Sequence, residues 1–125
     1  MDMFDVLKND GKARIIQELV PGKQITLAHV IANPDPVLYQ KLGLDPAADY
    51  KTSAIGIITL SPAETAIIAG DIATKASGAE LGFVDRFSGT LIVVGSVSQI
   101  EEAVEAVCTY VRETLGFTDC PITKT

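Results

Sequence analysis

The 125-residue sequence predicts an α+β fold in which two helices cover one face of a sheet. From residue 53 to residue 116 the pattern reads strand, helix, strand, strand, helix, one strand short of a split βαβ unit. A further strand pattern lies upstream, at residues 23–31. The predicted class is therefore a ferredoxin-like two-layer sandwich whose last strand comes from the N-terminal side, as in a circular permutation.

Hydrophobic pattern and helix signals indicate the first strand and the first long helix. Residues 53–60 are apolar and rich in β-branched side chains, which is typical of a buried strand. The next four residues, Ser-Pro-Ala-Glu at 61–64, match a capping box with proline in the first turn. We expect a helix to begin there and to end just before Gly78, because glycine commonly follows a helix C-terminus.

A hairpin is predicted to follow this helix. Its first strand covers residues 79–87, where alternation places Leu81 and Phe83 on one face and polar residues on the other. Its second strand, residues 90–97, is almost continuously apolar. Gly89 lies in the turn between the strands, where its tolerance of positive φ is useful.

The last long helix is predicted over about residues 99–115. The four residues Ser-Gln-Ile-Glu at 98–101 repeat the capping-box pattern at its start. Five side chains at helical spacing share one face and are expected to be buried, namely Val104, Val107, Cys108, Val111 and Leu115. Cys108 is then most simply a small buried hydrophobic residue.

The N-terminal part of the chain carries three further predicted elements. Residues 1–13 are polar and are expected to be a flexible extension, and residues 14–20 form a short strand candidate before a Pro-Gly turn. The strand at residues 23–31 is expected to turn four alternating side chains to one side, Ile25, Leu27, His29 and Ile31. Asn33-Pro34 resembles a helix cap followed by proline, so a short helix is expected up to about Leu42, with Gly43 after it.

Composition limits the classes of function. A chain of this length forms one domain. Its 47% hydrophobic residues and mean hydropathy of +0.30 suggest apolar surface that is buried against neighbouring subunits. A net charge of −6 with no basic stripe argues against nucleic-acid binding. With no apolar run of membrane-spanning length and no signal-peptide pattern, we expect a soluble, cytoplasmic protein.

The sequence offers no set of residues that would carry catalysis. His29 is the single histidine, and on an apolar strand face it is expected to be a hydrogen-bonded core or interface residue. One histidine without a cysteine pair at ligand spacing does not support a zinc site. Cys108 and Cys120 are expected to stay thiols in a cytoplasmic chain. We therefore predict no cofactor, no metal and no enzymatic activity.

Three long segments resemble one known family. VPGKQITLAHVIANP, AIGIITLSPAETAIIAGDIATK and LGFVDRFSGTLIVVGSV are similar to the circularly permuted hexameric shell proteins of bacterial microcompartments, in particular those of ethanolamine and propanediol utilisation. The resemblance runs from about residue 14 to residue 125 and leaves residues 1–13 outside it. It implies a circularly permuted shell domain that assembles as a hexamer and tiles laterally with other shell proteins.

The resemblance also implies where neighbouring hexamers meet. Lys75 matches a lysine at the hexamer edge, and Asp71, four residues before it, would help to orient it. Arg86 is a weaker candidate for the same lateral surface. The residues alone equally allow a plain, solvated i,i+4 ion pair between Asp71 and Lys75.

The resemblance further implies a modified pore on the sixfold axis. Phe87, Ser88 and Gly89 match the glycine-containing loop that surrounds the pore in non-permuted relatives, although a plain turn fits the residues as well. Six copies of residues 14–20 are expected to close into a small parallel barrel over this pore. Six strands should leave no open lumen, because side chains already fill the interior of a barrel of about eight strands. The barrel residues are Arg14, Ile15, Ile16, Gln17, Glu18 and Leu19.

Gly56 lies in the middle of the strand at residues 53–60, where glycine costs stability. Two explanations are open. Gly56 either marks a bend in the strand, which would make the hexamer depart from flatness, or it permits close packing beneath a helix.

The sequence therefore predicts a structural shell protein that forms a homo-hexamer, contacts other shell proteins and has the enclosed enzymes as candidate partners. It predicts no nucleic-acid or membrane partner. A small-molecule-binding regulatory protein of ferredoxin-like fold is the alternative from another class, and a small enzyme of this fold is a third. The sequence does not indicate which metabolic pathway the shell would enclose.

Overall fold

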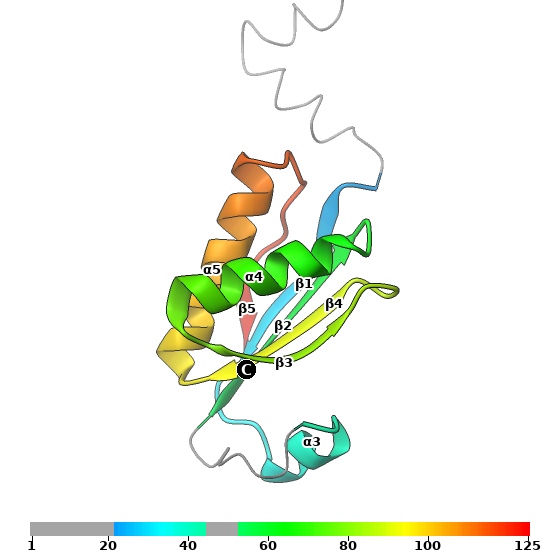
Figure 1. Cartoon of the computed structure of the whole chain (residues 1–125). Coiled ribbons are helices and arrows are strands. Elements are labelled where there is room, and N and C mark those ends of the chain that lie inside the picture. The colour runs from blue at the N-terminus through cyan, green and yellow to red at the C-terminus, as the bar shows by residue number, and fades with distance from the viewer. Residues whose placement is uncertain (1–21, 45–52) are drawn as a thin grey trace, which may run out of the picture.

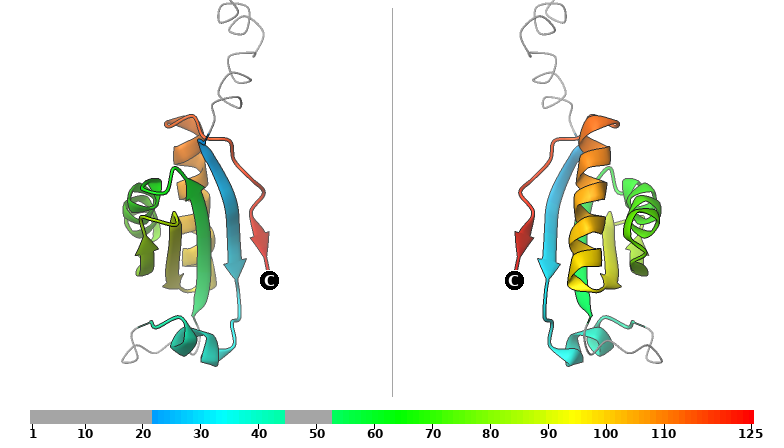
Figure 2. Two further views of the ribbon diagram at one scale, coloured as in Figure 1. Left: turned by 90° about the vertical axis from the view of Figure 1, so that its right-hand side faces the viewer. Right: turned by 90° about the vertical axis from the view of Figure 1, so that its left-hand side faces the viewer.

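The computed structural model describes residues 22–44 and 53–125. A mixed five-stranded sheet carries two long helices on one face, α4 (Thr65–Ser77) and α5 (Val97–Glu113), as Figures 1 and 2 show. A short helix, α3 (Pro36–Lys41), contributes to a second cluster on the opposite face. The strands are β1 (Gln24–Ile31), β2 (Ala54–Ser61), β3 (Glu80–Asp85), β4 (Thr90–Gly95) and β5 (Thr123–Lys124). The predicted α+β class is confirmed.

The sheet order is β3-β4-β2-β1-β5. The strand predicted at residues 23–31 is confirmed as β1, which pairs antiparallel with β2 on the side away from β4. The residues after α5, to which the sequence pattern assigns no strand, form β5 parallel to β1. The backbone explains this pairing, because Thr125 N–H donates to Val30 O at 2.9 Å and Ala32 N–H donates to Thr125 O at 2.8 Å. The outer edge of β1 is thereby paired.

A β-bulge in β3 overturns the predicted common face of Leu81 and Phe83. The register shifts between them, so that Leu81 pairs with Val93 and Phe83 pairs with Ile92. Val93 belongs to the cluster beneath the helices and Ile92 to the cluster on the opposite face. Leu81 and Phe83 therefore lie on opposite faces. Gly82 fits the site of the bulge, because a Cβ there would come within 3.1 Å of a carbonyl oxygen in β4.

A second bulge changes the faces of β1. The register with β2 shifts between Ile25 and Leu27. Ile25 is buried in the cluster beneath the helices, whereas Leu27 is 40% exposed and pairs with Thr59. The predicted common face of Ile25 and Leu27 is therefore wrong. The bulge also lets the Thr26 hydroxyl donate to the Thr59 carbonyl at 3.2 Å.

All three described helices begin at residues other than those predicted. Ser61 remains in β2, so α4 begins at Thr65 with Glu64 as its N-cap and without a side-chain capping bond. In α5 the capping box exists but lies two residues earlier, where Ser96 accepts from the Gln99 N–H and the Gln99 side chain accepts from the Ser96 N–H. The start of α3 shifts in the same way, from Asn33 to the next Asx-Pro pair, Asp35-Pro36.

The helix ends agree with the sequence. Gly78 follows α4 with a φ of 74°, and Gly43 follows α3 with a φ of 72°. The predicted buried face of α5 is also confirmed, since Val104, Val107, Cys108 and Val111 are buried and Leu115 packs against them.

The inner face of α4 consists of small residues. Its buried positions are Thr65, Ala66, Ala69, Gly70 and Ala73, whereas Ile67 and Ile68 are 51% and 45% exposed. Small side chains bring α4 close to the sheet and to α5. As a consequence, two large apolar side chains of this helix face outward.

Gly56 lies where β2 passes closely beneath α5. A Cβ at this position would be 2.8 Å from Cγ2 of Ile100 and 2.9 Å from Cγ2 of Val93. The pairing of β2 with β1 and β4 runs through Gly56 without a register shift. Close packing beneath a helix is therefore confirmed as a reason for this glycine, and the predicted strand bend stays a prediction.

Candidate functional site

The turn between β3 and β4 is held by Asp85. One carboxylate oxygen of Asp85 accepts from the Phe87 N–H at 2.8 Å, and the other accepts from the Ser88 hydroxyl at 2.8 Å. These bonds, the Phe87 backbone first and the Ser88 hydroxyl second, lower the pKa of Asp85 below its ordinary value near 3.8. The turn therefore presents Phe87 and Ser88 in a defined conformation.

Gly89 closes this turn against the end of β2. It has a φ of 76°, and its carbonyl accepts from the Leu60 N–H at 2.9 Å. A Cβ at this position would lie 2.2 Å from the Leu60 carbonyl oxygen, a separation that no side chain tolerates. The predicted use of glycine in this turn is confirmed.

Phe87 is the most exposed of the large apolar side chains that the structure describes. Its side chain is 82% exposed, and the Arg86 guanidinium lies over its ring at 5.0 Å from the centroid. Both residues line a shallow hollow of about 320 Å³, together with Ile67 of α4 and Val84 of β3. An exposed aromatic ring beside a cation is a common composition for protein contacts.

Further exposed apolar residues lie around this turn on α4 and β3. They are Ile67 and Ile68 on α4 and Leu81, Phe83 and Val84 on β3. We call these five residues, together with Phe87, the apolar edge. β3 is the outermost strand on its side of the described sheet, so its free backbone groups border the same surface. Several exposed apolar side chains at a sheet edge indicate a protein contact.

The apolar edge is not among the features that the sequence predicts. One signal was present in the sequence: α4 carries apolar residues on more than one stripe, in the run Ala-Ile-Ile-Ala-Gly. Its alanines and glycine pack inward, and this leaves Ile67 and Ile68 without a place in the core.

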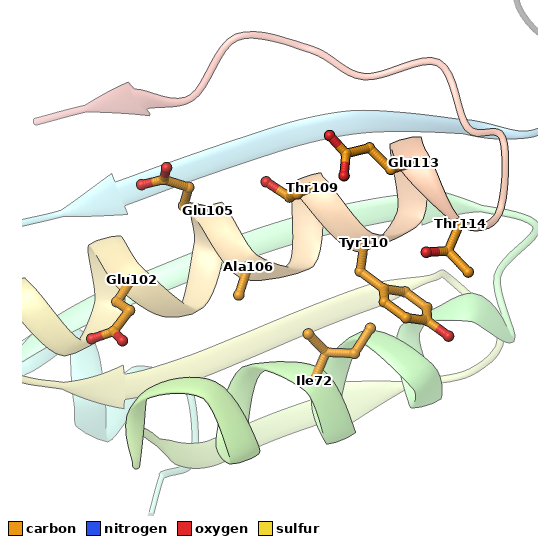
Figure 3. Close-up of a pocket in the computed structure, with 8 residues that line it drawn as sticks. All are labelled: Ile72, Glu102, Glu105, Ala106, Thr109, Tyr110, Glu113 and Thr114. Carbon is orange, nitrogen blue, oxygen red and sulfur yellow. The ribbon is translucent and has the colours of Figure 1, made fainter.

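A groove of about 610 Å³ runs along the outer surface of α5 beside α4. Figure 3 shows Ile72 of α4 opposite Ala106 and Tyr110 of α5, which form the apolar part of the groove. Glutamate side chains lie at its margins. The groove shares no lining residue with the apolar edge.

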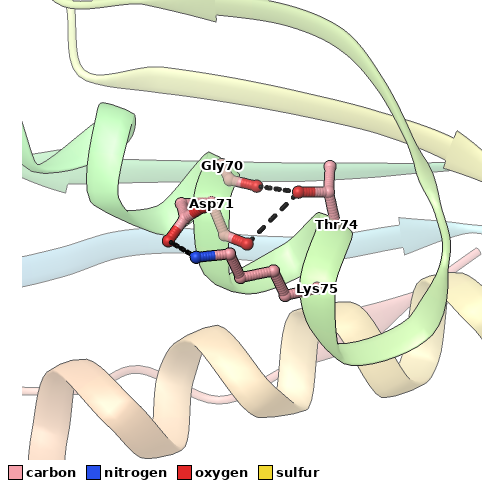
Figure 4. A network of polar contacts seen from close by, with 4 residues as sticks. All are labelled: Gly70, Asp71, Thr74 and Lys75. Atoms are coloured by element: carbon pink, nitrogen blue, oxygen red, sulfur yellow. Dashed lines mark hydrogen bonds and ion pairs between the residues drawn. The ribbon is translucent and has the colours of Figure 1, made fainter.

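Asp71 and Lys75 form the predicted ion pair on the outer side of α4. Lys75 Nζ lies 2.9 Å from Asp71 Oδ2, and the two side chains are 75% and 60% exposed, respectively (Figure 4). The Thr74 hydroxyl donates to the carbonyl oxygens of Gly70 and Asp71 in the same turn. An exposed pair of this kind contributes at most about 1 kcal/mol, so it explains little of the stability of the subunit.

His29 joins β1 to the C-terminal strand. Its Nδ1 lies 2.6 Å from the Thr123 hydroxyl and its Nε2 lies 2.8 Å from the Thr125 hydroxyl. The prediction of a hydrogen-bonded histidine is therefore confirmed, although its partners are two hydroxyls from the far end of the chain. Both ring nitrogens of His29 therefore have a hydroxyl partner, and the residue has a structural role in holding the C-terminal strand.

The two cysteines are free thiols. Cys108 is buried in α5, and desolvation raises its pKa to about 11, so that it stays protonated at neutral pH. Among the described residues, no group of three or more histidine, cysteine, aspartate or glutamate side chains could hold a metal ion. None of the helices in residues 22–44 and 53–125 combines the length and apolar character that crossing a bilayer requires.

The similarity of this chain to known proteins identifies its family. Residues 54–123, more than half of the chain, match the BMC domain. Over 112 residues the chain is 53% identical to the bacterial microcompartment shell protein PduU of Salmonella typhimurium, and the alignment covers 90% of this chain and 93% of PduU. The chain belongs to the bacterial microcompartment shell proteins.

Two further relatives support this membership of the shell proteins. The shell protein EutS of Escherichia coli is 51% identical over 113 residues, with 90% of this chain and 97% of EutS covered. The solved structure described as a CutR flat hexamer matches with a TM-score of 0.77 and 46% identity, covering 85% of this chain and 94% of that chain. The predicted resemblance is therefore confirmed.

Within this shell protein, the structure brings some of the predicted site residues together. Arg86, Phe87, Ser88 and Gly89 share one turn, and Asp71 and Lys75 are adjacent on α4. The roles of the two groups at the pore and at the hexamer edge stay predictions. The extension at residues 1–13 and the barrel strand at residues 14–20 lie outside the described residues.

Proposed function

We propose that this shell protein is a structural, non-catalytic tile that assembles as a hexamer in the wall of a bacterial microcompartment in the cytoplasm. The observation that carries the proposal is the apolar edge. A subunit of this size exposes Ile67, Leu81 and Phe87 together beside an outermost strand. In a chain 46% identical to a protein solved as a flat hexamer, subunit contact is the natural use of such a surface.

The proposal includes a circularly permuted domain. β1, the first described strand, occupies the sheet position that the last strand of a split βαβ unit would fill. The BMC domain match begins at residue 54, at the start of β2, and so leaves β1 outside it. A strand supplied from the opposite end of the chain accounts for both observations.

The proposal assigns residues 14–20 to an axial barrel built from six subunits. The turn at 86–89, with Phe87 exposed, would surround the pore beneath it. Deleting residues 1–20 should leave the sheet folded, because β1 is already paired with β2 on one side and β5 on the other. An electron cryo-microscopy map of the deleted hexamer should show an open axial pore, and a chain that no longer folds would contradict the barrel assignment.

The proposal also places Lys75 at the perimeter of the hexamer, where other shell proteins meet it. Its side chain is 75% exposed, and its ammonium group is bound only by Asp71 among the described residues. The head group can therefore contact a neighbouring tile without breaking a buried interaction. Arg86 lies over Phe87 in the turn that we assign to the pore, so Lys75 is the residue that we place at the perimeter, and the enclosed enzymes are further candidate partners.

Light-scattering mass tests the central claim. At micromolar concentration and without ligand, the protein should have a mass of six times 13.2 kDa. The double substitution of Leu81 and Phe87 by serine should lower this mass, because it removes apolar area from the edge. A stable monomer or trimer of the unsubstituted protein would disprove the hexameric tile.

A further inference from the structure

We propose that Cys108 and Cys120 form a reversible disulfide that locks the C-terminal segment against α5. Cys108 lies on the buried side of α5, and Cys120 lies in the segment between α5 and β5. Both are free thiols, and both line one hollow of about 340 Å³. The proposal goes beyond the structural role of the tile, because it assigns a redox-sensitive modification site to each subunit.

One stripe of α5 faces the C-terminal segment. Its members recur at spacings of four, three and four residues and so share one side of the helix: Glu101, Glu105, Cys108 and Arg112. The two ends of the stripe form ion pairs with the C-terminal segment, Arg112 with Asp119 at 3.0 Å and Glu101 with Lys124 at 3.2 Å. The segment therefore runs antiparallel to α5 along this stripe.

The two ion pairs bring Cys120 to the level of Cys108. Between the paired residues the helix and an extended chain both span about 16 Å, so the two stretches match in length. Cys120 directly follows Asp119, and Cys108 lies one helical turn from Arg112. Both thiols therefore lie just inside the same ion pair.

The C-terminal segment directs the Cys120 side chain toward α5. Thr118 pairs with Gln24 and Thr123 with His29, five residues further along each segment, so the chain between them is extended. In an extended chain Cys120 shares its side with Lys124, which reaches α5, and not with Thr123, whose hydroxyl contacts His29. Cys120 accordingly packs against the core cluster that contains Cys108.

The two thiols differ in their access to solvent. Cys108 is buried, whereas Cys120 is only partly buried, so Cys120 meets an oxidant first and Cys108 is the resolving thiol. Desolvation raises the pKa of Cys108 to about 11 and also raises the pKa of Cys120, so thiolates are scarce at neutral pH. The pair therefore stays reduced under ordinary cytoplasmic conditions, and its oxidation accelerates as pH rises.

Hydrogen peroxide is the oxidant in this proposal. The Cys120 thiolate attacks one peroxide oxygen and the O–O bond breaks, which gives Cys120 sulfenic acid and a hydroxide that takes up the proton lost by the thiol. The Cys108 sulfur then attacks Cys120 Sγ, so that the S–S bond forms, the S–O bond breaks, and the departing hydroxide takes up the Cys108 proton. Two thiols and one peroxide thus give one disulfide and two waters. A small dithiol reduces the disulfide again by exchange.

The disulfide fastens the C-terminal segment over the outer edge of β1. On one side of Cys120, Thr118 N–H donates to Lys23 O at 3.0 Å and Ile25 N–H donates to Thr118 O at 2.8 Å. On the other side, β5 pairs with β1. A covalent link between these two sets of bonds opposes the opening of both, and so keeps the backbone groups at this edge of β1 from pairing with another strand.

Peroxide treatment of the full-length assembled protein tests the proposal. Trypsin cleaves after Arg112 and so places the two cysteines in different peptides, residues 87–112 and residues 113–124. Once free thiols are blocked, we expect mass spectrometry to show these two peptides joined, and to show them apart after treatment with dithiothreitol. Hydrogen exchange of the Thr125 amide should slow about tenfold in the oxidised protein and recover on reduction.

Matched variants separate the disulfide from other effects of peroxide. Cys108→Ala and Cys120→Ala each retain one thiol, and peroxide should leave the exchange of the Thr125 amide unchanged in both. Circular dichroism and light scattering establish that the fold and the oligomer are retained. Cys120→Ser, which keeps the size of the side chain, takes the place of Cys120→Ala if alanine disturbs the fold.

Three results would overturn the proposal. The first is the absence of the joined peptides after peroxide treatment, whether the thiols remain free or are oxidised singly. The second is a covalent dimer that joins two copies of the same peptide, since the link would then lie between chains. The third is unchanged exchange of the Thr125 amide in protein that carries the disulfide, since the link would then lock nothing.

Discussion

At the scale of single residues, neighbouring atoms lie too close to two glycines to leave room for a side chain. A Cβ at Gly56 would lie 2.8 Å from Ile100, and a Cβ at Gly89 would lie 2.2 Å from a carbonyl oxygen. Gly70 is different, because a Cβ there would make ordinary contacts of 3.4 and 3.5 Å with leucine side chains. The three positions therefore predict different responses to the same substitution.

Gly56→Ala should destabilise the protein, and Gly70→Ala should not. The methyl group at Gly56 overpacks the contact between β2 and α5, which typically costs about 1–3 kcal/mol of unfolding free energy. At Gly70, in the interior of α4, alanine has the higher helix propensity and should stabilise by up to about 1 kcal/mol. Denaturant unfolding of both variants measures the difference, and equal effects would contradict the packing argument.

Asp85 predicts a contribution to stability that depends on pH. Its pKa in the folded protein is below the ordinary value near 3.8, so the unfolded chain takes up the proton first as pH falls. The stabilisation by Asp85 is therefore complete well above pH 3.8 and is lost as pH falls through the folded pKa.

Comparison with Asp85→Asn measures this contribution. The substituted protein should be less stable at neutral pH, and the difference in unfolding free energy from the unsubstituted protein should shrink below about pH 4. A difference that stays constant down to pH 3 would contradict the role of the carboxylate charge in the turn.

At the scale of elements, the C-terminal strand depends on contacts with β1. β5 has two residues, both exposed, and is held by its parallel pairing with β1, by two backbone hydrogen bonds of the adjoining Thr125, by the His29 contacts and by the Lys124–Glu101 ion pair at 3.2 Å. Such a short edge element is expected to open far more often than the core strands.

His29→Leu should loosen β5 without unfolding the sheet. The substitution removes both side-chain contacts to Thr123 and Thr125, each worth about 0.5–1.5 kcal/mol. Hydrogen exchange of the Thr125 amide should accelerate roughly tenfold or more, while exchange in β2 stays unchanged. Thr26→Val, which removes a hydroxyl from the opposite end of β1, is the matched control and should leave the Thr125 amide unaffected.

At the scale of the whole molecule, different surfaces serve different contacts. The apolar edge gathers six side chains beside β3, whereas the Asp71–Lys75 pair is polar and exposed. Apolar area suits the permanent contacts within a hexamer, and a mobile charge suits weaker contacts between hexamers. In the proposed tile, the stability of the hexamer and the assembly of hexamers with one another therefore depend on different surfaces.

Lys75→Ala should affect assembly and not the hexamer. The ion pair with Asp71 is exposed and contributes at most about 1 kcal/mol, so the thermal midpoint should barely change. A small loss of contact energy at each edge of a hexamer adds up over all its edges. It should severely reduce the formation of hexamer layers and co-assembly with partner shell proteins. Lys41→Ala, at the exposed end of α3, is the control. Normal assembly of the Lys75 variant would return the pair to a plain surface interaction.

Much of the fold and part of the site follow from local sequence. The series of elements, the glycines that end α3 and α4, the buried face of α5 and the Asp71–Lys75 pair were all readable from spacing and residue type. Helix starts were less readable, because the sequence holds neighbouring Asx-Pro and serine signals and the strand before α4 runs on to Ser61. Several local signals competed there, and strand pairing decided between them.

The sequence by itself determined the α+β class and the family, because periodicity and motifs are properties of neighbouring residues. Only the tertiary structure decided that Leu81 and Phe83 face opposite ways and that His29 holds a strand 94 residues away. It also decided that Ile67 and Ile68 of α4 point outward. The physical reason is common to all three: bulges, edge pairing and helix orientation depend on what lies opposite a residue in space.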